Sequence, residues 1–101
     1  MKYRKLGKTG LEVSEIGLGC EGFLEKEESF VKEMFALALE QGINCMDMYS
    51  PNPELHKRVG NIIHHQREKF VLQGHLCTIW QNEQYKATRN IKEVKTAFET
   101  M

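Results

Sequence analysis

The chain lacks the features that would place it in an oxidising compartment or in a membrane. Its three cysteines are far apart and form no C-x-x-C pair, which favours free thiols over disulfides. The longest apolar runs, such as residues 34–39, are too short to cross a bilayer. The charged residues at the N-terminus are not followed by the apolar stretch of a signal peptide. We therefore expect a cytoplasmic protein.

An excess of charge of one sign is also missing. Fourteen basic and fourteen acidic side chains cancel, and no segment concentrates either sign, so nucleic acid and membranes are not expected as partners.

His75 and Cys77 would share one side of a strand, with His64 and His65 nearby in sequence. This spacing matches no specific ligand pattern, and no metal site is predicted.

What is present is a globular composition, with 41% hydrophobic and 28% charged residues. We expect a single domain over residues 1–101 with a modest core. Its first element is a hairpin of residues 3–6 and 11–13, because the glycines of the connecting turn can supply positive φ angles. A short buried strand over residues 14–20 follows.

Two amphipathic helices are predicted next, with a strand between them. Residues 25–41 carry an apolar stripe that ends at Gly42, where a helix prefers a left-handed residue. Residues 43–48 form the second strand. Asn52 can then cap a helix with a proline in its first turn, and this helix runs to about His65.

The rest of the chain predicts a third strand, a loop and a third helix. Residues 70–73 are an apolar run that suits a parallel sheet buried on both faces. Residues 77–89 are polar around Trp80 and Tyr85, and we expect a loop across the mouth of a barrel. The two aromatic residues would either roof a substrate pocket or anchor this loop.

A third helix begins at Asn90, where Glu93 three positions later resembles a capping box. The order is then a hairpin followed by three β-α units. Alternating strands and helices with short connections predict an α/β fold with parallel strands, here a partial (β/α)₈ TIM barrel. Three units cannot close a barrel, so open sheet edges and self-association of the chain are expected.

Ligands of such folds collect at the C-terminal ends of the strands, here residues 19–21, 47–49 and 74–76. Asp47 is the strongest candidate for a functional residue, because a carboxylate that closes an apolar strand must find a partner or face solvent. The alternative is that Asp47 only caps the loop that follows.

Three segments resemble the N-terminal part of the aldo/keto reductase family: YRKLGKTGLEVSEIGLG, LEQGINCMD and REKFVLQGHLC. The resemblance implies a barrel enzyme that reduces small carbonyl substrates with NADPH. In that family a tyrosine protonates the carbonyl oxygen, and an aspartate and a lysine tune the tyrosine. The QGHLC segment and the loop YSPNPEL resemble a divergent branch, some members of which carry an iron-sulfur module at the C-terminus.

The family's catalytic residues carry over in part. The aspartate matches Asp47, whereas the usual tyrosine position holds Asn52, which leaves Tyr49 as the tyrosine within reach. His75 stands where the lysine is expected, and a histidine would replace a permanent charge with a conditional one. Tyr49 as a packing residue and His75 as a hydrogen-bonded strand end are the structural alternatives.

Gly19 and Cys20 occupy positions that lie near the nicotinamide in the family, so the resemblance implies cofactor contacts for them and for Asp47. The alternative for Cys20 is a small buried hydrophobic residue. The family's catalytic histidine and phosphate-binding loops belong to later strands. We therefore expect an N-terminal fragment of an NADP-dependent oxidoreductase that is inactive alone. A non-catalytic interaction module, or a barrel that binds cofactor without catalysis, are the alternatives.

Overall fold

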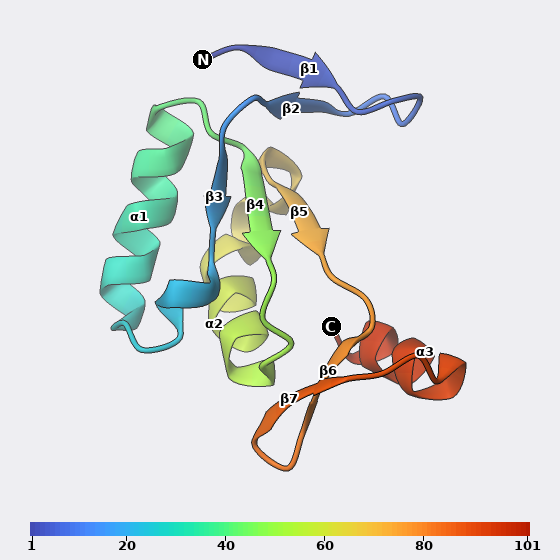
Figure 1. Cartoon of the computed structure of the whole chain (residues 1–101). Coiled ribbons are helices and arrows are strands. Elements are labelled where there is room, and N and C mark those ends of the chain that lie inside the picture. The colour runs from blue at the N-terminus through green and yellow to red at the C-terminus, as the bar shows by residue number, and fades with distance from the viewer.

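The computed structural model describes residues 1–101 as a three-stranded sheet covered by helices and flanked by two hairpins (Figure 1). The strands and helices, in chain order, are β1 (Tyr3–Lys5), β2 (Glu12–Ser14), β3 (Gly17–Gly19), the 3₁₀ helix η1 (Glu21–Phe23), α1 (Glu28–Glu40), β4 (Cys45–Met48), α2 (Pro53–Ile63), the 3₁₀ helix η2 (His64–Lys69), β5 (Val71–Gly74), β6 (Thr78–Gln81), β7 (Gln84–Ala87) and α3 (Ile91–Thr100). None of the helices is long and apolar enough to cross a membrane.

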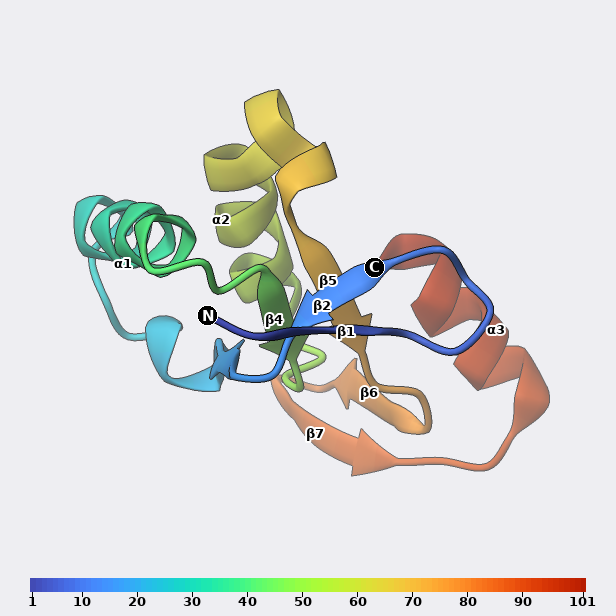
Figure 2. The same ribbon diagram turned by 90° about the horizontal axis from the view of Figure 1, so that it is seen from above.

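The central sheet is parallel, in the order β3-β4-β5. Its register places Gly19 beside Asp47 and Asp47 beside Gln73. The spatial order of the strands follows the chain order, and α1 and α2 lie on the same side of the sheet (Figures 1 and 2). Successive β-α units of a barrel have this arrangement. The predicted α/β fold with a partial barrel is therefore confirmed.

The predicted N-terminal hairpin is also confirmed, and it lies across the N-terminal ends of the sheet strands (Figure 1). Gly7 and Gly10 have φ angles of +56° and +80°, which a glycine adopts without steric cost. The hairpin is joined to the start of β4 by a reciprocal pair of hydrogen bonds. The Ser14 N–H donates to Asn44 Oδ1 at 2.8 Å, and the Asn44 N–H donates to Ser14 Oγ at 3.1 Å.

Helix α1 starts at Glu28, three residues later than the sequence predicts. The residues before it form η1 and a turn, which Arg58 of α2 holds in place. Its Nη1 donates to the backbone carbonyls of Phe23, Leu24 and Lys26, at 3.0, 2.8 and 2.5 Å. These carbonyls therefore have a side-chain donor from α2, and the segment does not need to form the backbone hydrogen bonds of a longer α1.

The other helix boundaries follow the sequence more closely. Gly42 has a φ angle of +79° directly after α1, as the predicted helix stop requires. Asn52 Oδ1 accepts the Glu54 N–H at 2.9 Å, so the predicted cap of α2 is made, with Pro53 as the first helical residue. The helix ends at Ile63, two residues before the predicted end, and η2 continues the turn.

The hydrophobic core lies between the sheet and the two helices. Met46 and Met48 of β4 face it. The ring of Phe35 packs against Phe70 with centroids 5.5 Å apart and against Phe23 at 6.0 Å. The other buried members are Cys20, Val31 and Ala38 near α1 and Leu55, Val59 and Ile63 of α2. One face of the sheet is therefore covered by helices, whereas the prediction that the third strand is buried on both faces is wrong.

Residues 77–89 form a second hairpin, β6–β7, and the predicted loop is wrong. Its turn residues Asn82 and Glu83 have φ angles of 52° and 61°, which is the geometry of a tight turn between antiparallel strands. Trp80 pairs with Tyr85, and the two rings meet edge to face at 5.4 Å. The hairpin lies beyond the C-terminal ends of β4 and β5 (Figure 1).

The start of α3 differs from a capping box. Asn90 Oδ1 accepts the Lys92 N–H at 3.0 Å, as predicted, but the Asn90 N–H donates to Thr88 Oγ1 at 3.1 Å. Glu93 turns instead to the hairpin, where it accepts hydrogen bonds from the Thr88 hydroxyl and from Lys86 Nζ. These bonds, with that from Thr88 the stronger, lower the pKa of Glu93 from its usual value. Helix α3 is therefore attached to β7 through its first turn.

Candidate active site

The C-terminal ends of the three parallel strands bring the candidate residues together. Side chains alternate along β4, so that Met46 and Met48 face the core while Cys45 and Asp47 face the opposite side. The register puts Gly19 on one flank of Asp47 and Gln73 on the other. The exposed face of the sheet, opposite α1 and α2, therefore carries a carboxylate between a glycine and an amide. We call it the bare face.

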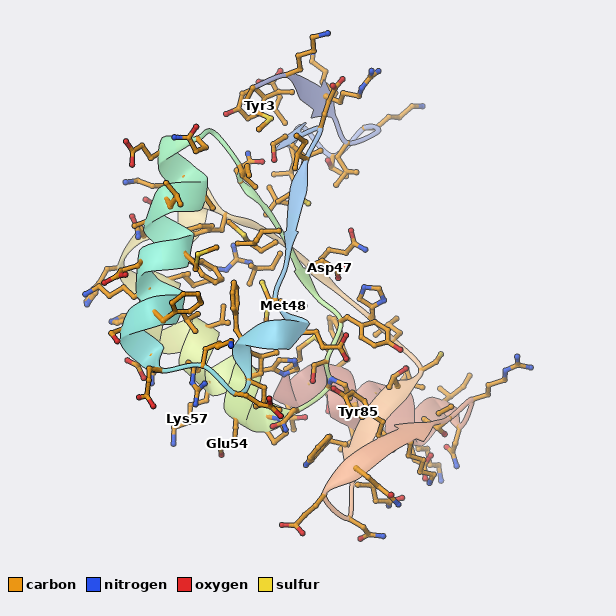
Figure 3. All side chains as sticks on the ribbon, turned by 60° about the vertical axis from the view of Figure 1, so that its left-hand side comes forward. Tyr3, Asp47, Met48, Glu54, Lys57 and Tyr85 are labelled. Atoms are coloured by element: carbon orange, nitrogen blue, oxygen red, sulfur yellow. The ribbon has the colours of Figure 1, made fainter.

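Asp47, which is labelled in Figure 3, forms the centre of the site together with His75. His75 Nε2 lies 2.7 Å from Asp47 Oδ1. An ionised carboxylate only accepts hydrogen bonds, so His75 carries its proton on Nε2 when Asp47 is charged. The side chains are 41% and 31% exposed, for Asp47 and His75 respectively, which makes the pair accessible to a ligand and a modest contributor to stability.

Tyr49 completes this cluster. Its ring meets the His75 imidazole edge to face, with centroids 5.1 Å apart, and the residue is exposed. Asn52, at the family's usual tyrosine position, is buried and occupied by its role as the cap of α2. The structure thus brings together the three residues predicted as catalytic, Asp47, Tyr49 and His75.

The two other predicted cofactor contacts differ in access. Gly19 is exposed, and a Cβ added to it would meet no atom within 4 Å. Cys20 is fully buried, and its Sγ donates to the Leu18 carbonyl at 3.6 Å. Burial, and to a lesser degree the charge of Asp47, raise the pKa of the Cys20 thiol to about 12. The structure therefore gives Cys20 the role of a small core residue, whereas Gly19 leaves open space beside Asp47.

A second polar cluster lies at the same end of the sheet. Of its members, the sequence analysis named Tyr85 but not Ser50 or Glu21. The Tyr85 hydroxyl lies 3.0 Å from Ser50 Oγ and 3.2 Å from Glu21 Oε1. Ser50 is buried, and its carbonyl is 2.7 Å from His56 Nε2. We call Glu21, Ser50 and Tyr85 the loop clasp, because they come from the segments that follow β3 and β4 and from the hairpin. Of the two predicted roles of Tyr85, the structure supports the anchoring of the segment.

No signal in the sequence selects Ser50 or Glu21, since serine and glutamate are common in polar loops. Their partners are 35 and 64 residues away along the chain. Two hollows of the structure lie away from the bare face. One, of about 780 Å³, is lined by α2, β5 and α3, and another, of about 450 Å³, lies between α2, β6 and α3. Asp47, Tyr49 and His75 line neither of these two hollows, and their side chains are partly exposed to solvent.

A metal centre has no support in the structure. No three side chains of histidine, cysteine, aspartate or glutamate come close enough together to hold an ion. The pair of His64 and His65 rings, with centroids 3.6 Å apart, lies on η2 and not at the strand ends. The chemistry of the candidate site therefore comes from a carboxylate, an imidazole and a phenol.

Known proteins resemble the chain in sequence and in fold. No protein-family model matches the chain. The uncharacterized oxidoreductase YqkF of Bacillus subtilis is 33% identical over 87 residues, which cover 81% of this chain and 27% of the relative. Two solved structures from Pseudomonas aeruginosa, both assigned as aldo-keto reductases, superpose with a TM-score of 0.78. They are 26% identical over 97% of this chain, which spans 41% of theirs.

Sequence and fold together define the chain as an oxidoreductase-like part of a β/α barrel. It is similar to the aldo/keto reductases over most of its length, and the resemblance seen in its sequence is thereby confirmed. The chain spans about a quarter of the length of the curated relative and two fifths of the length of the solved ones, and it corresponds to part of such a barrel.

Proposed function

We propose that the chain supplies the proton-handling side of an NADP-dependent carbonyl reductase site, with Asp47, His75 and Tyr49 as its catalytic residues. The observation that carries the proposal is the hydrogen bond of 2.7 Å between His75 and Asp47, with the ring of Tyr49 against the imidazole. Adjacent parallel strands deliver the first two residues to the same rim. The similarity to oxidoreductases supports the reaction class.

Reduction of a carbonyl group adds a hydride to its carbon and a proton to its oxygen. A nicotinamide cofactor, when bound, would supply the hydride and leave oxidised. The residues of the chain handle the proton, which Tyr49 or a water molecule beside it donates to the carbonyl oxygen. Protonated His75 stabilises the negative charge left on the donor, and Asp47 holds the imidazole in place.

The bare face fits the nicotinamide end of such a cofactor. Gly19 has no side chain, and the space where its Cβ would stand is open, so a flat ring can approach the backbone next to Asp47. In the family that the chain resembles, the adenosine phosphate is held by loops of the last strands. We therefore expect that the 101-residue chain alone neither binds NADPH at micromolar affinity nor reduces carbonyl compounds.

A chimeric barrel tests the proposal. Residues 1–101 replace the corresponding part of the Pseudomonas aeruginosa aldo-keto reductase, so that the missing strands are restored. We expect NADPH-dependent reduction of small aldehydes, and loss of the rate by at least about a hundredfold in Asp47→Asn, which removes a charge needed for general acid catalysis. Gln41→Ala, at an exposed position directly after α1 and away from the bare face, is the control and should leave the rate unchanged.

His75 gives the assignment its sharpest test. The proposal needs a positive charge at this position, so His75→Lys should keep the chimera active, also at alkaline pH, because an ammonium group keeps its charge there. If His75→Ala leaves both the rate and its pH profile unchanged in a chimera that binds NADPH, His75 is only a strand-end residue and the proposed site is wrong.

A non-catalytic interaction module is the second candidate function. The observation that favours it is the accessible surface of 7366 Å², which is large for the length of the chain.

A cytoplasmic location belongs to both proposals and is supported by three cysteines that form no disulfide.

A further inference from the structure

The loop that carries Tyr49 is held by its neighbour Ser50. Ser50 is 1% exposed, and both its hydroxyl and its carbonyl have partners. Its Oγ accepts the Asn52 N–H at 3.2 Å and lies 3.0 Å from the Tyr85 hydroxyl, while its carbonyl accepts from His56 Nε2 at 2.7 Å. The position of Ser50 therefore sets where the backbone of Tyr49 lies above the strand ends.

The hydrogen bonds of the loop clasp have one direction. The Glu21 carboxylate only accepts, so the Tyr85 hydroxyl donates its single proton to Glu21 Oε1. The Ser50 hydroxyl must then donate to the oxygen of Tyr85, since the phenol has no second proton to give. The phenol of Tyr85 thus links the segment after β4 to the segment after β3.

The ring of Tyr85 is fixed independently of its hydroxyl. Trp80 lies across the hairpin and meets the ring edge to face at 5.4 Å and 84°. Replacement of Tyr85 by phenylalanine therefore keeps the packing of the hairpin and removes the two hydrogen bonds of the loop clasp alone. Figure 3 shows Tyr85 on the side of the molecule away from Tyr3, the other tyrosine whose hydroxyl has a partner in the chain.

We propose that Tyr85 is a positioning residue of the candidate active site: its hydroxyl, through Ser50, fixes the segment that places Tyr49 against His75. The consequence for catalysis rests on the proposed function, whereas the structural coupling between hairpin and loop does not. The hairpin β6–β7 then belongs to the site as a support for its proton donor.

Hydrogen–deuterium exchange with residue resolution tests the coupling in the 101-residue chain. The Asn52 amide, which donates to Ser50 Oγ, is the reporter. In Tyr85→Phe we expect it to exchange several-fold faster, with the amides of β6, β7 and α2 unchanged. Tyr3→Phe is the matched control, because it removes a phenol hydrogen bond to the Gly42 carbonyl of 2.7 Å at the opposite end of the sheet and should not move the reporter.

Two further variants separate the positioning role from a general loss of stability. Glu21→Gln keeps an acceptor for the phenol, so the Asn52 amide should exchange at nearly the original rate in this variant. In the double variant Ser50→Ala, Tyr85→Phe the Asn52 amide should exchange no faster than in Ser50→Ala alone, because both substitutions remove the same link. Unchanged exchange at Asn52 in Tyr85→Phe, or acceleration spread equally over the hairpin and α2, would overturn the proposal.

The chimeric barrel then measures what the coupling contributes to turnover. Tyr85→Phe should lower kcat several-fold and leave the affinity for NADPH unchanged, because the proposed contacts of the cofactor are Gly19, Asp47 and the phosphate loops of later strands, and only the proton donor is displaced. If the Asn52 amide exchanges faster in Tyr85→Phe but kcat does not change, the coupling between hairpin and loop holds and Tyr49 is not the proton donor. Failure of the proposed function is thereby distinguished from failure of the structural coupling.

Discussion

The two faces of the β3-β4-β5 sheet differ in both cover and composition. The face towards α1 and α2 presents Leu18, Met46, Met48 and Leu72, and its methionines are buried. The bare face presents Gly17, Gly19, Cys45, Asp47, Val71 and Gln73 in the same three strands. Because side chains alternate along a strand, a single backbone carries both sets. The covered face stabilises the fold, and the bare face holds the groups that can do chemistry.

The two faces also differ in what surrounds them. In a closed barrel the bare face would look inwards, towards strands that this chain does not contain. A folded monomer of 11.7 kDa is expected to expose about 5,900 Å², and the chain exposes 7366 Å². Its radius of gyration, 14.3 Å, likewise exceeds the value of about 13 Å expected for its length. The difference is close to the area that one partner of a large interface contributes.

The largest effect we expect is therefore self-association of the 101-residue chain. The extra exposed surface of roughly 1,500 Å² exceeds the ~800 Å² per partner of a standard interface, and both edges of the parallel sheet are unpaired. Sedimentation velocity at micromolar concentration should show dimers or larger species. A single monomeric boundary, together with cooperative thermal unfolding, would show that the chain is a stable monomer with the bare face exposed to water, and would contradict the prediction.

Paired substitutions on the two faces test the division of roles. Phe35→Ala removes a ring that is 1% exposed and packs against two others, so we expect a loss of about 3–5 kcal/mol in the free energy of unfolding. Gln73→Ala, exposed on the bare face, should change it by less than about 0.5 kcal/mol. Urea denaturation followed by circular dichroism measures both at the same protein concentration.

The control variant also reports on the association. If Gln73→Ala lowers the free energy of unfolding as much as a core substitution does, the bare face is packed against something in solution. In a solution of the pure protein, this can only be a second copy of the chain. The destabilisation should then depend on protein concentration, because a dimer is stabilised by mass action. An equal and concentration-independent cost for both variants would contradict the assignment of the two faces.

Thiol labelling gives a smaller but more local measure of the same contrast. Cys45 lies on the bare face and is half-buried, Cys77 is exposed, and Cys20 is fully buried among core residues. We expect iodoacetamide at pH 8 to label Cys77 first, Cys45 next and Cys20 only on unfolding, because a buried thiol with a raised pKa forms little thiolate. Mass spectrometry of the digested protein reads each site. Protection of Cys45 that disappears on dilution would place it in an interface.

The sequence predicted the covered face better than the bare one. The apolar periodicity of α1 and α2, the glycine that stops α1 and the asparagine that caps α2 are local signals, and each was found in the structure. The convergence of Asp47, Tyr49 and His75 also followed from strand polarity, since parallel strands end at one rim. Their roles in catalysis stay predictions.

The features that the sequence missed depend on contacts and turns outside the periodic patterns of helices and strands. Arg58 delays α1 by binding three carbonyls that are 32 to 35 residues away. Glu93 leaves the expected capping box because Lys86 and Thr88 of the neighbouring hairpin compete for its carboxylate. The hairpin itself was hidden because Asn82 and Glu83 make its turn without a glycine. Such long-range or atypical contacts leave no periodic pattern in a single sequence.

The smallest effect that we predict is a loss of folding stability at alkaline pH. It involves Cys20 of the core and Asp47 of the bare face. Cys20 belongs to the core, yet Asp47 on the bare face contributes, after burial, to raising its pKa to about 12 from a reference of 9.0. Above pH 9 the unfolded chain releases this proton while the folded chain keeps it, so stability should be complete below pH 9 and fall as the pH rises towards 12. Urea midpoints measured between pH 8 and pH 11 should therefore decline more steeply in the original chain than in Cys20→Ala, whose constant cost does not titrate. Asp47→Asn should flatten the decline slightly, because it removes the lesser cause and leaves burial. If Asp47→Asn abolishes the decline altogether, charge on the bare face and not burial controls the thiol, and the two faces are coupled more strongly than their packing indicates.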